Sequence, residues 1–214
     1  GSVAIGKSAL TSLTSGAGNL AIGNLAGSGI TTGAYNLAIG RGVLQHCVDG
    51  INNIGIGYGA MADWDVGGGT STTVDGSNNN VMIGVGAGGG AWTNVQSNYN
   101  VAIGNISMDA AMDGALYNTA VGHHSLGGIT TGDKNVAVGA TAGHTTTEGN
   151  QNVLLGYGAV AEDATALHQI VLGYEATGVA DYSVTLGNAN VTAVYAAQDS
   201  GATVYCSGVN FPDT

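Results

Sequence analysis

The two tryptophans of the chain lie in the stretches that offer the clearest ligand-binding chemistry. Trp64 stands between two aspartates, and Trp92 is followed within six positions by three planar amides. An aromatic ring can pack against the C–H groups of a sugar, while amides and carboxylates hydrogen-bond its hydroxyls. The candidate glycan-binding or receptor-binding residues are Asp63, Trp64, Asp65, Trp92, Asn94, Gln96 and Asn98. The alternative, in which each tryptophan only packs its own loop, is equally compatible with the sequence.

Catalytic and metal-binding motifs are not evident in the sequence. It contains no nucleophile elbow, Walker loop or zinc spacing, and Asp63 and Asp65 lack the further oxygen ligands of a calcium loop. Cys47 and Cys206 match no metal or redox spacing, and we interpret them as small packed residues rather than a disulfide. We therefore expect no enzyme, metal or cofactor. A polysaccharide depolymerase with carboxylate pairs formed between chains is a minor alternative.

Composition narrows the possible partners. The 214 residues include 39 glycines, and 14 acidic residues against 3 basic ones give a net charge of −11. Phosphate-rich partners need several cations to displace their counterions, so we exclude binding to nucleic acid or to an anionic membrane surface. Every apolar run is interrupted within five or six residues, which also excludes insertion into a membrane. The hydrophobic fraction of 44% nevertheless predicts a folded chain.

A short repeat organises the positions of all these residues. Eleven copies of a motif such as NLAIG or NVAVG occur, and their closing glycines are most often 17 residues apart. A repeat of this length holds two short strands and two turns, which predicts an all-β fold, a parallel β-solenoid (β-roll) with 17-residue rungs. The roll spans residues 1–187, with loop insertions at 62–79 and 88–99, and a short C-terminal β segment occupies residues 188–214. The recurring asparagines are expected to bond neighbouring rungs as a ladder.

Within each motif a small residue stands between two large ones, as in Val3-Ala4-Ile5. Successive strand residues face opposite sides, so we expect the large residues to fill the interior of the coil. The small residues would then lie on a second apolar face that packs against other copies of the chain, which predicts a homo-oligomer. The predicted interface residues are Ala4, Ala21, Ala38, Ala102, Ala120 and Ala137.

The pattern N-x-A-I/V-G, followed by A-L or A-G and then T-T-G, resembles two groups of proteins that share a trimeric left-handed parallel β-roll. These are the shafts of bacteriophage tail fibres and the heads of bacterial trimeric autotransporter adhesins. The 17-residue period is more similar to the phage group, because adhesin heads usually repeat at a shorter period. The segment 183–214, with Val209, Phe211, Pro212 and Asp213 in a V-x-F-P-D sequence, resembles the part of phage fibres that precedes a cleavable intramolecular chaperone.

The resemblance implies a homotrimeric tail-fibre segment of a virion that attaches to the host cell. Its expected partners are further copies of itself, adjacent fibre segments, and a glycan or protein receptor on the host surface. The first alternative is an adhesin head on a bacterial cell surface. A less favoured one is an ice-binding solenoid, because threonines pair at Thr31-Thr32 and Thr130-Thr131 but do not recur on every rung.

Overall fold

The computed structural model of the chain describes residues 1–62, 76–90, 92 and 95–194. Each repeat contributes one three-residue strand to a single parallel sheet, and the strands follow one another in sequence order. They are β1 (Val3–Ile5), β2 (Leu20–Ile22), β3 (Leu37–Ile39), β4 (Ile54–Ile56), β5 (Val81–Ile83), β6 (Val101–Ile103), β7 (Thr119–Val121), β8 (Val136–Val138), β9 (Val153–Leu155), β10 (Ile170–Leu172) and β11 (Val184–Leu186).

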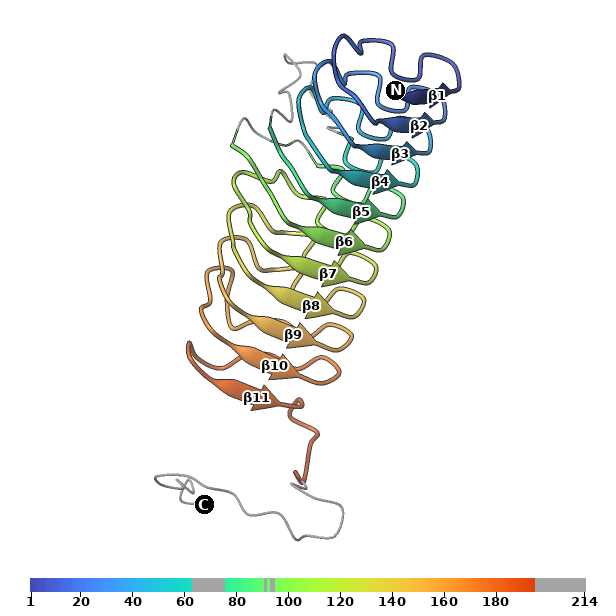
Figure 1. The fold of residues 1–214 in the computed structure, drawn as a ribbon. Helices are drawn as coiled ribbons and strands as arrows, with labels where there is room; N and C mark the ends of the chain where they lie inside the picture. The colour runs from blue at the N-terminus through green and yellow to red at the C-terminus, as the bar shows by residue number, and fades with distance from the viewer. Residues whose placement is uncertain (63–75, 91, 93–94, 195–214) are drawn as a thin grey trace, which may run out of the picture.

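The strands stack along one side of an elongated coil, and turns complete each rung (Figure 1). No helix occurs among the described residues, so the predicted all-β parallel solenoid with turns of about 17 residues is confirmed. The predicted second strand is replaced by turns that still bond rung to rung, as in the bond from the backbone N of Leu126 to the carbonyl O of Ala142, 2.9 Å long.

The long insertion leaves the register of the sheet intact. β4 and β5 are separated by the 27-residue repeat, yet they pair directly, with Gly55 opposite Met82. β5 and β6, separated by 20 residues, pair in the same way, with Met82 opposite Ala102. Both longer repeats therefore keep the strand pairing of the regular ones.

The predicted facing of the strands is wrong. The middle residues point into the coil, where Ala21, Ala38, Ala102, Ala120 and Ala137 are at most 1% exposed. The large flanking residues lie at the surface instead, and Ile103 and Val138 remain about 40% exposed. These five alanines therefore cannot contact another copy of the chain while the coil is folded. Ala4 is exposed only because no rung covers β1.

The interior accepts small strand residues because the opposite wall of the coil supplies the large ones. Leu44, Met61, Met108 and Leu126 are fully buried on that wall. At Gly55, the middle position of β4, an added Cβ would lie only 2.5 Å from a methyl group of Val43. Close packing thus decides which strand face turns inward, and hydrophobicity alone does not.

Candidate functional site

The predicted tryptophan site is only partly within the described residues, since Asp63, Trp64, Asp65 and Asn94 lie outside them. Trp92 is 1% exposed, and its indole Nε1 donates a hydrogen bond of 2.7 Å to the carbonyl O of Gly88. No face of this indole is open to a ligand. For Trp92 the glycan-binding interpretation is therefore wrong, and the alternative of loop packing is right.

The two remaining candidate residues have different environments. Asn98 is half-buried, and its Oδ1 accepts a 2.6 Å hydrogen bond from the backbone N of Asn78. The Oδ1 of Asn78 in turn accepts one from the backbone N of Ile51, also 2.6 Å long. Asn98 therefore belongs to an amide ladder that joins successive rungs. Gln96 is exposed and lies against Gly76.

The outer surface of the sheet is an extended apolar feature of the described coil. Two rows of Val, Ile and Leu run along it, because the first and third residues of nearly every strand face outward. Partly exposed members far from either end of the coil include Ile103, Val138 and Leu155. We call this surface the aliphatic face. Sequence reasoning found its residues but placed them inside.

Tyrosines border the aliphatic face on both sides. Seven tyrosines lie two positions before or after a strand. Those before a strand are Tyr35, Tyr99, Tyr117 and Tyr182, and those after a strand are Tyr58, Tyr157 and Tyr174. All seven are at least 43% exposed. Tyr99 and Tyr117 stack with ring centroids 4.9 Å apart, and Tyr157 and Tyr174 with 5.4 Å. An apolar centre with an aromatic and polar rim is typical of protein–protein interfaces.

A cluster of ionisable groups crosses three rungs beside this face. Nε2 of His124 lies 3.7 Å from Oδ1 of Asp109, an atom that is shielded from solvent and accepts no hydrogen bond. His124 also lies beside His123 and His144, with ring centroids 6.3 and 6.1 Å apart. Burial raises the pKa of the Asp109 carboxyl, and the nearby His124 opposes that rise. Neither here nor elsewhere in the described residues do three His, Cys, Asp or Glu side chains form a metal site.

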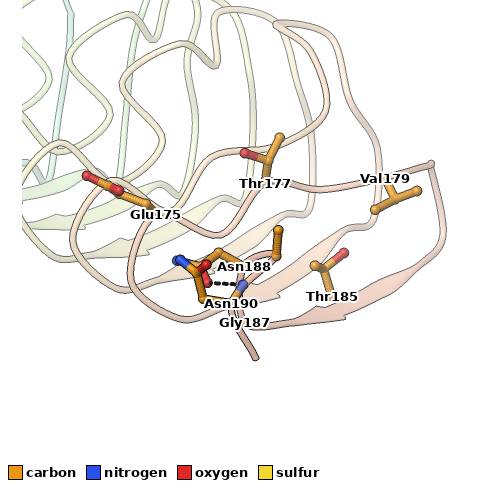
Figure 2. A pocket seen from close by; sticks show the side chains of 8 residues that line it. Glu175, Thr177, Val179, Thr185, Gly187, Asn188 and Asn190 are labelled. Atoms are coloured by element: carbon orange, nitrogen blue, oxygen red, sulfur yellow. Dashed lines mark hydrogen bonds between the residues drawn. The ribbon is translucent and has the colours of Figure 1, made fainter. Parts of the chain in front are cut away.

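A cavity of about 470 Å³ lies beside β11 (Figure 2). Its lining comes from the turn after β10 and from β11 and the residues that follow it, namely Glu175, Thr177, Val179, Thr185, Gly187, Asn188, Ala189 and Asn190. The backbone N of Asn190 donates a 3.0 Å hydrogen bond to Oδ1 of Asn188, which closes one side of the opening. The cavity forms where the last rung shortens to 14 residues, next to β11, the last strand of the sheet.

One threonine of each pair uses its hydroxyl group within the coil, whereas the other, Thr32 or Thr131, is exposed. Oγ1 of Thr31 donates to the carbonyl O of Val48 at 3.3 Å, and Oγ1 of Thr130 donates to that of Thr147 at 3.2 Å. Each bond joins one rung to the next. These hydroxyl protons are therefore not available to order water, which weakens the ice-binding alternative.

No protein-family model, no curated protein and no solved structure matches the chain. The described residues also include no helix that is long and apolar enough to cross a membrane.

Proposed function

We propose that the chain is a rod-like segment of a homotrimeric fibre of the phage tail-fibre type, which attaches to the surface of a host cell. The observation that carries this proposal is the aliphatic face, a long apolar surface bordered by tyrosines. Soluble monomers rarely leave so extended an apolar surface uncovered, and such surfaces mark interaction sites.

A further copy of the same chain is the best partner for this face. The face repeats once per rung over eleven strands, with the inter-strand spacing of a β-sheet, about 4.8 Å. A partner that fits every rung needs the same axial repeat, and another copy has it. Three copies around one axis would cover all three faces in a closed assembly.

Attachment to the host cell would then depend on the insertions that interrupt the regular repeat. Residues 62–79 and 88–99 interrupt the regular repeat without disturbing the sheet register, so they can vary while the rod stays rigid. In this proposal the rod connects adjacent fibre segments of a virion and carries loops that bind a host glycan or protein receptor. The role is binding and structural, with no catalytic step.

Assembly is the first part of the proposal to test. Val138→Asp combined with Leu155→Asp places two carboxylates on the aliphatic face, where burial without a partner is costly. We expect light scattering to give a trimer mass for the parent and a monomer mass for the variant. Thr131→Asp, at an exposed turn position, is the matched control and should remain trimeric. A monomeric parent would contradict the proposal.

Attachment needs a separate measurement. Fluorescently labelled parent protein should bind to cells of at least one strain in a broad bacterial panel, and excess unlabelled protein should compete for that binding. Binding should be stronger for the trimer than for the monomeric variant, because three linked sites add by avidity. A trimer that binds no strain would retain the assembly proposal and remove the attachment role.

A further inference from the structure

A small pocket lies at the corner where the chain leaves β3. It has a volume of about 190 Å³ and is lined by Leu25, Arg41, Gly42, Gln45 and Tyr58. These residues come from three successive rungs, so the pocket exists only in the stacked coil. None of its lining residues belongs to the predicted tryptophan site.

The guanidinium of Arg41 gives the pocket its chemistry. Its central carbon lies 5.7 Å from the centroid of the Tyr58 ring, a distance at which the ring face holds a cation by electrostatic attraction. Arg41 forms no ion pair with any described residue. The guanidinium of Arg41, with its five N–H donors, is thus oriented by the Tyr58 ring and has no acidic partner among the described residues. Such a group can donate two parallel hydrogen bonds to the carboxylate of a ligand.

The charge distribution allows an anion to reach this pocket. Residues 1–60 carry Lys7 and Arg41 against Asp49 alone, a net charge of 2 − 1 = +1. The remaining residues carry Lys134 against 13 acidic residues, which is 1 − 13 = −12. Most of the negative charge of the chain therefore belongs to residues after position 60. Anions are repelled least by the segment 1–60, which contains Arg41.

We propose that this pocket binds the carboxylate of an acidic sugar. Arg41 would hold the carboxylate, Gln45 offers an amide for a neighbouring hydroxyl, and Leu25 with the Tyr58 ring offers apolar surface for C–H groups. The volume suits one carboxylate-bearing end of a glycan. A single arginine suits a singly charged carboxylate better than phosphate, which usually gathers several donors. As a receptor contact, this inference rests on the proposed attachment role.

Galacturonate and galactose form a matched pair of probes, because they differ at the carboxylate. In an NMR titration of the parent protein, galacturonate at millimolar to tens of millimolar concentration should shift the signals of Arg41, Gln45 and Tyr58 saturably, and galactose should not. Arg41→Gln and Arg41→Lys should each weaken binding roughly tenfold or more, because neither retains the fork of donors. Lys134→Gln, which removes one charge far from the pocket in sequence, should leave binding unchanged.

Three results would overturn this inference: no saturable binding of galacturonate, equal binding after Arg41→Gln, or equal binding of galactose. Tighter binding of inorganic phosphate than of galacturonate would replace the carboxylate assignment with a phosphate site and would also overturn it. If the parent still forms trimers and binds cells after any of these results, only the pocket assignment fails. If galacturonate binds through Arg41 but the parent attaches to no cell, the attachment role fails instead.

Discussion

The asparagines that precede the strands form a buried ladder along the coil. Asn118 receives bonds on its Oδ1 from the backbone N of Asn135 at 2.9 Å and from Nδ2 of Asn135 at 3.0 Å. Its own Nδ2 donates to Oδ1 of Asn100 and to the carbonyl O of Gly132. One side chain thus bonds polar groups in both adjacent rungs, as the sequence pattern predicted.

Replacement of this side chain should destabilise the coil strongly. Asn118→Ala leaves the backbone N of Asn135 and the carbonyl O of Gly132 buried without these partners, at roughly 1–3 kcal/mol each. We expect the free energy of unfolding, measured by chemical denaturation, to fall by roughly 2–5 kcal/mol. Asn24→Ala is the control, because Asn24 is only partly buried and makes one long bond of 3.3 Å. Equal losses in the two variants would contradict the structural role of the ladder.

The carboxyl of Asp109 should make stability depend on pH. Its pKa in the folded protein is raised by burial, so folding favours the protonated form. The stability that this group contributes is present at low pH and is lost as the pH rises through the folded pKa. Asp109→Asn removes the charge at nearly constant shape. We expect the variant to melt at a higher temperature than the parent at pH 7.

The same comparison should change with acidification. As the pH is lowered from 7 through the raised pKa of Asp109, the carboxyl gains its proton, and the difference in melting temperature between parent and variant should shrink. His124→Gln serves as the second variant, because it removes the imidazole that lies 3.7 Å from the carboxyl group and opposes the rise in the pKa of Asp109. The melting temperature of this variant should therefore fall more than that of the parent as the pH is raised to 7. A difference between Asp109→Asn and parent that grows on acidification would show that hydrogen bonds to the carboxylate outweigh its burial.

The closing glycines determine how closely consecutive rungs stack. Gly104 has a φ of +145°, and an added Cβ would collide with the carbonyl O of Gly122 in the next rung. Gly86 has a φ of +65°, but its nearest neighbour would be a side-chain methyl of Ile106 at 3.3 Å. An alanine at position 104 would therefore suffer both backbone strain and a collision with the backbone of the next rung, whereas an alanine at position 86 would suffer mainly the strain.

Gly104→Ala should consequently cost much more than Gly86→Ala. Left-handed strain alone is worth about 1–2 kcal/mol, which is the loss that we expect at Gly86. At Gly104 two rungs must also separate, so the loss should exceed about 3 kcal/mol and should reduce the cooperativity of thermal unfolding. Calorimetry of both variants provides the comparison. Similar losses would mean that the rungs can adjust to a Cβ at the closing glycine.

The sequence predicted the strands and their order well, because the repeat itself marks each rung and its pairing partner. Which strand face turns inward could not be read from Val101-Ala102-Ile103, since both faces are apolar. That choice depends on the opposite wall of the same rung, where residues such as Met108 fill the space. The stacking of Arg41 beside Tyr58 follows from the repeat, because the two residues are 17 positions apart, but the sequence analysis did not single out Arg41. The pocket itself required the stacked rungs.

As a whole molecule the coil is a rod held together by contacts between neighbouring rungs. Ten steps separate the eleven strands, so the sheet should be about 50 Å long at about 4.8 Å per step. Its hydrophobic core extends along the coil from rung to rung, so its stability is close to a sum of rung and interface terms. Long-range repulsion between charges can therefore act along its entire length.

Salt should stabilise this rod. The chain has a net charge of −11, and among described residues the one close pair of opposite ionisable groups is His124 with Asp109. Three copies would carry 3 × (−11) = −33, so repulsion opposes both folding and assembly. We expect the melting temperature to rise by a few degrees between low ionic strength and about 0.15 M sodium chloride, where the screening length falls to about 8 Å.

A variant with less repulsion separates this effect from a general action of salt. Glu162 and Asp163 are adjacent and exposed, and Glu162→Gln with Asp163→Asn reduces the net charge of each chain from −11 to −9. The double variant should melt higher than the parent at low salt, and its melting temperature should rise less as salt is added, because less repulsion is left to screen. A parent melting temperature that falls with added salt would instead mean that Lys7 and Lys134 make attractive contacts with acidic residues.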